Sequence, residues 1–203
     1  MHVRSLAACL LVGAAISLAG LGGGAVALEV PKGEKEALLK CERSLCDLVV
    51  KKGPTTGDFT CKISKTWAKD DLKQGSATGR MSWGFGDARC TLNLKLARAV
   101  VVSAVKDAKT TVQFPDHAVT CLIEGDKEPS NVTAILAPKA VFEGGRVTKI
   151  WVNLKTVEGP SMIKGLALTA AKLEDKLGIF HKPLVKSVNK LLTERCPRVV
   201  AGN

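Results

Sequence analysis

Aromatic residues are scarce in this chain, which has no tyrosine, three histidines and an aromatic content of 4% over 203 residues. Only two of the histidines, His117 and His181, lie beyond the N-terminal leader, and neither belongs to a paired cysteine or histidine cluster of the kind that binds zinc. A zinc site needs closely spaced cysteine or histidine ligands. The sequence therefore predicts no metal site and no cofactor.

The motifs of common catalytic sites are also missing. The chain has neither a Gly-x-Ser-x-Gly turn nor a His-Glu-x-x-His motif. Its one adjacent acid–base pair is Asp116-His117, at a predicted turn, and neighbours in sequence rarely point at each other. We therefore expect a protein that binds rather than catalyses, and a hydrolase that uses Asp116 and His117 remains an alternative.

The first 27 residues have the pattern of a signal peptide. Arg4 precedes an apolar stretch over residues 6–21, and Ala25-Val26-Ala27 is a small-x-small cleavage site. The apolar stretch is short and followed by glycines, so it is a poor permanent membrane span. The sequence predicts a signal peptide over residues 1–27 and one domain over residues 28–203. The mature protein is then periplasmic or secreted and not an integral membrane protein.

Cysteines support the same location, because six remain beyond the leader and an even number in an exported chain is typical of disulfides. Six cysteines allow fifteen connectivities. We favour Cys46 with Cys61 across a Gly-Pro turn, Cys90 with Cys121 within a sheet, and Cys41 with Cys196.

The formal net charge of +11 bears on partners rather than on fold. Positive charge favours anionic surfaces such as lipid headgroups, lipopolysaccharide or acidic polysaccharide, and nucleic acid is not expected as a partner of an exported protein. Lysines are scattered along the whole chain, so an ordinary solvated surface remains the alternative.

The clearest strand runs over residues 90–96, where apolar and polar side chains alternate strictly. Residues 34–50 predict a helix, with an apolar stripe at helical spacing and two glutamates in the first turn. A short helical turn is predicted over residues 67–74. Further strands are predicted over residues 58–65, 80–87, 99–105, 110–114 and 118–124.

A hairpin is predicted from Val132 to Val157 around Gly144-Gly145, with Phe142 opposite Val147 and Val141 opposite Thr148. Two amphipathic helices then end the chain, and we expect them to cover one face of this hairpin. The predicted fold class is α+β: an N-terminal helix, an antiparallel β-meander of about six or seven strands, and two C-terminal amphipathic helices, with disulfides holding them together.

Two groups of residues are candidate binding sites. Four aromatic residues at or near strands predict a pocket for an apolar ligand, with an ordinary packed core as the alternative. They are Trp67, Trp83, Phe85 and Trp151. The lysine row Lys182, Lys186 and Lys190 predicts contact with anionic lipid or polysaccharide, with a solvated helix face as the alternative.

The predicted function is thus an exported, non-catalytic protein that binds an apolar or anionic ligand of the cell envelope. The alternatives are a structural or protein-interaction module and the hydrolase named above. Asn131 begins an N-glycosylation pattern, which is relevant only in a host that glycosylates exported proteins.

Overall fold

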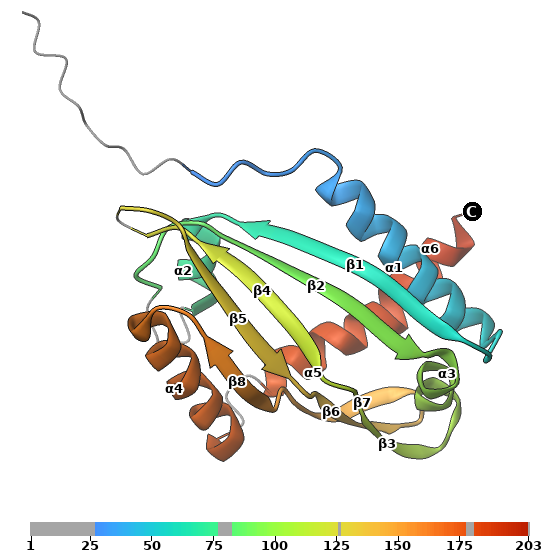
Figure 1. Ribbon diagram of the computed structural model, residues 1–203. Helices are drawn as coiled ribbons and strands as arrows, with labels where there is room; N and C mark the ends of the chain where they lie inside the picture. The colour runs from blue at the N-terminus through green and yellow to red at the C-terminus, as the bar shows by residue number, and fades with distance from the viewer. Residues whose placement is uncertain (1–26, 77–82, 126, 178–180, 203) are drawn as a thin grey trace, which may run out of the picture.

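Figure 1 shows the computed structural model of the protein, which describes residues 27–76, 83–125, 127–177 and 181–202. The predicted signal peptide lies outside these ranges except for its last residue. The helices are α1 (Glu34–Lys51), α2 (Lys69–Ser76), α3 (Arg98–Lys106), α4 (Ser161–Leu177), α5 (His181–Lys190) and α6 (Cys196–Ala201), and the π-helical turn η1 (Leu191–Arg195) joins the last two. The strands are β1 (Asp58–Trp67), β2 (Ala88–Ala97), β3 (Lys109–Gln113), β4 (His117–Ile123), β5 (Ser130–Leu136), β6 (Lys139–Glu143), β7 (Arg146–Trp151) and β8 (Leu154–Glu158).

The predicted α+β class is confirmed, with an N-terminal helix, antiparallel strands and C-terminal helices. The described strands form two sheets: a five-stranded sheet A in the order β1-β2-β4-β5-β8 and a three-stranded sheet B in the order β3-β6-β7. The strand over residues 90–96 is confirmed as the middle of β2, which pairs with β1 along its whole length and with β4 at one end. An antiparallel sheet commonly has one packed and one solvated face. On the open face of sheet A, Thr60, Asn93 and Thr120 are exposed.

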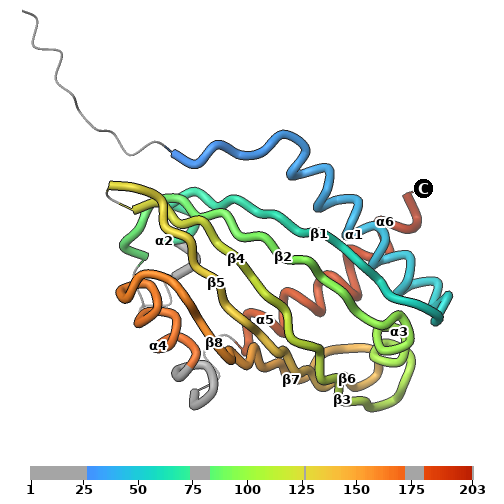
Figure 2. Tube along the Cα trace, viewed as in Figure 1, coloured from blue at the N-terminus to red at the C-terminus, as the bar shows by residue number. Residues whose placement is uncertain are grey.

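The N-terminal helix is confirmed as α1, and it is tied to two other elements by disulfides. Cys90–Cys121 links β2 to β4 as predicted, with Cα atoms 4.0 Å apart. The other two predicted pairings are wrong. Cys41 bonds to Cys61 on β1, and Cys46 bonds to Cys196 at the start of α6. The reason is that α1 packs against β1 on one side and against α6 on another. Cys41 lies on the side that faces β1, and Cys46 lies on the side that faces α6. Figure 2 shows α6 beside α1.

Two predicted strands are not strands. Residues 99–105 lie in helix α3, where Val101, Val102 and Ala104 are buried on one side. β-Branched residues lower helix propensity only slightly, so this burial decides the conformation. Residues 83–87 of the predicted 80–87 strand have no regular structure, and the remainder lies outside the described residues. The short helical turn begins later than predicted, because Trp67 is the last residue of β1.

The tight turn at Gly144-Gly145 is confirmed: both glycines have positive φ, 56° and 74°, and Phe142 pairs with Val147 across β6 and β7. The long hairpin around it is wrong in two respects. A register shift pairs Val141 with Lys149 instead of Thr148. The outer parts of the predicted hairpin, β5 and β8, belong to sheet A and pair with each other there.

The C-terminal helices divide between the two sheets. Helix α5 packs on β7, and its Val185 and Val188 contact the buried cluster of sheet B. Helix α4 packs beside β8 and places Ile163 on the covered face of sheet A. The helical cover of Phe142 and Val147 comes from Val185 and Val188 of α5, together with Leu192 of η1 and Ala104 of α3.

Candidate functional site

The covered face of sheet A carries a row of apolar side chains that the helices leave partly exposed. Ile63, Leu92 and Val119 are directly paired across β1, β2 and β4, and Leu136 continues the same face on β5. All four are only partly buried. Large aliphatic residues at the centre of a covered sheet are usually fully buried. We call these four residues the apolar strip.

Two separate buried clusters lie at the two ends of this face. The first joins α1 and α3 to the start of β1 and the end of β2, and the second joins α4 to the opposite end of the sheet. The α1 cluster consists of Leu48, Val49, Phe59, Val101 and Val102. The α4 cluster consists of Ala88, Ile123, Val132, Val157 and Ile163. The apolar strip belongs to neither of them, nor to the sheet B cluster, among the described residues.

Helix α5 crosses behind sheet A in Figure 1, but its close contacts are with β7. Of its apolar residues, Val185 and Val188 contact the sheet B cluster, whereas Leu184 is partly exposed and joins no described cluster. The strip therefore lies between the two packed ends of this face, and its four side chains keep part of their surface exposed.

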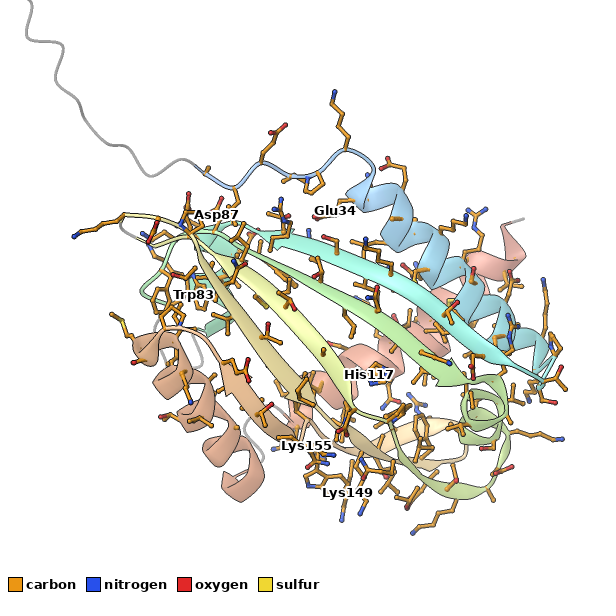
Figure 3. All side chains as sticks on the ribbon, viewed as in Figure 1. Glu34, Trp83, Asp87, His117, Lys149 and Lys155 are labelled. Carbon is orange, nitrogen blue, oxygen red and sulfur yellow. A yellow bond between two sulfur atoms is a disulfide. The ribbon has the colours of Figure 1, made fainter. Side chains whose placement is uncertain are left out.

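The four predicted ligand-binding aromatics do not form one group. Trp83 and Phe85 form an edge-to-face pair with ring centroids 5.2 Å apart, and both pack against the α4 cluster. Trp67 pairs with Ala88 of that cluster, so it lies at the same end of sheet A. Trp151 is in sheet B, where Lys139 Nζ lies 5.6 Å from its ring centroid. Figure 3 shows Trp83 at the end of the sheet near α2 and α4.

The predicted lysine row is exposed along α5 at Lys182, Lys186 and Lys190. Asn189, which is next to this row on the same helix, fastens α5 to the edge of β7. Asn189 accepts a hydrogen bond from Val147 N–H and donates one to Val147 O, both at 2.8 Å. The row is thus held in a fixed place, on the helix that crosses the covered side of sheet A.

Asp116 and His117 are adjacent, but the structure gives each a different partner. Both carboxylate oxygens of Asp116 contact Lys155 Nζ, at 2.6 and 2.9 Å. His117 is buried, with Nε2 3.4 Å from Lys95 N and Nδ1 2.7 Å from Pro115 O. Because the Lys95 amide can only donate, Nε2 accepts and Nδ1 donates to the Pro115 carbonyl. The two ring nitrogens are therefore occupied by backbone groups.

A cavity of about 460 Å³ adjoins His117 where β2 and β4 diverge. Its polar lining includes Asn93, Gln113 and Asp116. Figure 3 shows His117 and Lys155 towards this end of the sheet, away from Trp83 and Asp87. This volume lies within the usual range for small-molecule sites, about 300–1,000 Å³.

Two buried carboxylates carry no sequence pattern that predicts their burial. Glu34, at the start of α1, is 6% exposed and accepts hydrogen bonds from Thr66 N–H at 2.9 Å and Thr66 Oγ1 at 2.7 Å. Burial raises the pKa of Glu34, but the Thr66 hydrogen bonds and the Lys65 and Arg89 charges outweigh it, so its pKa is lowered. Figure 3 shows Glu34 beside β1, where it fastens the helix to the sheet edge.

The second is Glu124, just after β4, which is also 6% exposed. Its Oε2 accepts a hydrogen bond from Asp87 N–H at 2.9 Å, and its Oε1 has no hydrogen-bond partner among the described residues. A second cavity, of about 330 Å³, lies against it. One residue in the sequence bears on this arrangement: Gly86, whose backbone packs against the Glu124 side chain.

Within the described ranges, no three His, Cys, Asp or Glu side chains are grouped so as to hold a metal ion. No described helix is long and apolar enough to cross a membrane. No protein-family model, curated protein or solved structure matches this chain.

Proposed function

We propose that the protein is an exported binding protein that holds the apolar chain of an envelope amphiphile along the apolar strip of sheet A. The observation that carries this proposal is the partial exposure of Ile63, Leu92, Val119 and Leu136 on a sheet face whose two ends are packed. An acyl chain laid across these residues removes their remaining apolar surface from water, at about 25 cal/mol per Å².

The three disulfides support the exported part of this proposal, because disulfides persist in oxidising compartments. The lysines of α5 support an amphiphile with an anionic end. Lys182, Lys186 and Lys190 give three exposed positive charges to the helix that crosses the same side of sheet A. Surface lysines attract anionic groups without fixing their identity.

The first test is native mass spectrometry of protein purified gently from its exported location, before and after organic extraction. A discrete adduct that extraction removes is the expected result, and its mass gives the chemical class of the ligand. A bare polypeptide in both samples counts against the proposal.

The second test places one charge in the strip and an equal charge on the other face of the same strand. In Val119→Lys the ammonium lies within the strip, whereas in Ala118→Lys it lies on the open face, where Ala118 is already exposed. We expect Val119→Lys to weaken binding of a dansyl-labelled fatty acid by at least about tenfold, because an acyl chain cannot solvate an ammonium group. Ala118→Lys should bind like the parent protein.

Equal affinity of the two variants for the labelled fatty acid refutes a site on the strip. Circular dichroism of both proteins shows whether either variant has lost its fold. If neither the parent protein nor Ala118→Lys binds any fatty acid, a structural or protein-interaction module is the better description.

The hydrolase alternative receives no support from the contacts of its two residues. Asp116 is ion-paired with Lys155, and the ring nitrogens of His117 are bonded to backbone groups. A general base needs a free nitrogen within reach of the proton that it removes. We therefore do not propose that the protein is a hydrolase that uses these two residues.

A further inference from the structure

Glu124 is an unusual group within the described part of the chain. It is 6% exposed, and its Oε1 is buried without a hydrogen-bond partner among the described residues. Buried polar atoms in native proteins are almost always paired, and an unpaired atom calls for an explanation. A buried carboxylate oxygen needs a donor or a cation to offset the hydration it has lost.

The surrounding backbone is shaped to hold this carboxylate. Glu124 N–H donates to Asp87 O and Gly86 N–H donates to Glu124 O, both at 2.9 Å, so the ladder of β2 and β4 continues one step beyond the strands. Gly86 has no side chain, and a Cβ there would lie 2.7 Å from Glu124 Cβ. Trp83 Nε1 donates to Gly86 O at 2.7 Å and so fixes the loop of residues 83–86.

The cavity of about 330 Å³ beside Glu124 has two kinds of lining. Phe85, Ile123, Met162 and Ile163 supply apolar walls, and Met162 is 75% exposed at the rim. Among the described residues, the charged part of the lining is two glutamates and one lysine: Glu124, Glu128 and Lys127. The cavity is therefore locally acidic, in a chain whose formal net charge is +11.

We propose that this cavity binds a small primary alkylamine, with its ammonium group on Glu124 Oε1 and its alkyl stem against the apolar walls. An ammonium group supplies the N–H donors and the positive charge that this oxygen lacks. An ammonium fits better than a metal ion, because no described group of three acidic, cysteine or histidine side chains is available to complete a coordination shell. This site is distinct from the apolar strip and does not depend on it.

The test uses the protein with its disulfides intact, hexylamine as the probe, and the amide resonance of Asp87 as the readout. Asp87 N–H donates to Oε2 of the same carboxylate, so its chemical shift changes when a cation reaches Oε1. We expect saturable shifts with a dissociation constant of roughly 1 mM or below. Hexanol, which has the same stem without the charge, should bind at least about tenfold more weakly.

Three variants separate the ammonium site from general effects. Glu124→Gln keeps the shape but presents an amide, and we expect it to weaken hexylamine binding by at least about tenfold. Glu143→Gln, an exposed glutamate of sheet B outside the cavity, is the matched control and should bind normally. Met162→Ala removes an apolar wall at an exposed position, so it should weaken binding severalfold without changing stability.

The length of the alkyl chain of the amine provides a test that needs no folded Glu124 variant. Butylamine has two methylenes fewer than hexylamine and should bind about fifteenfold more weakly, since each buried methylene contributes about fourfold. Equal binding of hexanol and hexylamine, or unchanged affinity in Glu124→Gln, overturns the proposal. The absence of saturable shifts at Asp87 also overturns the proposal, and a buried water is then the partner of Glu124 Oε1.

Discussion

Replacing Glu34 by alanine should destabilise the protein far more than the same change two residues later. Glu34 and Glu36 both lie in the first turn of α1, but Glu34 is buried and Glu36 is exposed. Only Glu34 accepts the two hydrogen bonds from Thr66, which join the start of α1 to the end of β1. The pair of variants therefore compares a bonded with a solvated glutamate in one helix turn.

The magnitude follows from those two bonds. A hydrogen bond to a charged group contributes about 1.5–3 kcal/mol, and its loss leaves a buried donor unsatisfied. Thr66 is 6% exposed, so its N–H has little access to replacement water in Glu34→Ala. Lys65 Nζ, 3.7 Å from Oε1, is largely solvated and adds little. We expect Glu34→Ala to lower the free energy of unfolding by about 3 kcal/mol, and Glu36→Ala by less than about 0.5 kcal/mol.

The effect should depend on pH with a definite sign. Folding lowers the pKa of Glu34 from its ordinary value of 4.5, because the Thr66 hydrogen bonds and nearby positive charges outweigh the effect of burial. A carboxyl group with a lowered folded pKa stabilises the fold above its unfolded pKa and loses that contribution as the pH falls through the folded value. The difference between parent and Glu34→Ala should therefore be full at pH 7 and shrink below pH 4.5.

Urea denaturation of the disulfide-intact protein, followed by tryptophan fluorescence at neutral and acidic pH, measures both quantities. Glu36→Ala, measured in parallel, accounts for any effect of net charge or of the helix dipole. The reasoning is refuted if Glu34→Ala costs no more than Glu36→Ala at pH 7. It is also refuted if the cost is the same at both pH values.

Two further substitutions test the packing around the candidate sites. Gly86→Ala should lower the free energy of unfolding by about 1–3 kcal/mol, because the new methyl group clashes with the Glu124 side chain. A methyl group at Gly84 points into open space, so Gly84→Ala should be tolerated. Equal urea midpoints for the two variants would contradict this. Asn189→Ala removes both hydrogen bonds to Val147, so we expect a loss of about 2 kcal/mol and more aggregation through the freed edge of β7, measured by light scattering. Ser187→Ala, an exposed change on the same helix, should match the parent protein.

The sequence predicted the elements whose patterns are local. Helix α1 has its apolar stripe and acidic first turn, and β2 has strict alternation, so both are recognised within a short window. The turn at Gly144-Gly145 is equally local, because two positive φ angles require glycine there. The α+β class follows from these elements and from the two amphipathic helices at the C-terminus.

What the sequence did not predict depends on tertiary contacts. The valines of α3 favour a strand by propensity, but they pack into the α1 cluster as a helix. Cys41 and Cys46 lie on one helix, and which partner each one meets depends on where β1 and α6 lie around it. Sequence spacing cannot supply that information.

The candidate sites show the same division. Of the four aromatic residues that predict a pocket, Trp83 and Phe85 pack against each other, and the pocket itself stays a prediction. Trp151 lies in the other sheet, and this separation depends on strand pairing that has no local pattern in the sequence. The burial of Glu34 and Glu124 arises from segments at least 30 residues away in the chain, so no local pattern indicates it.

The three disulfides hold together a fold whose described core is divided into separate clusters. The described core consists of three separate clusters, so burial at the centre of sheet A adds less stability than a continuous core would. Cys41–Cys61 fixes α1 to β1, Cys46–Cys196 fixes α1 to the C-terminal helix, and Cys90–Cys121 joins two of the strands that carry the strip. A disulfide stabilises mainly by restricting the unfolded chain, typically by about 2–4 kcal/mol, and this contribution requires no packing at the strip. The covalent links thus hold the sheet and its helices in place around the partly exposed strip, which is the surface that we propose for ligand binding.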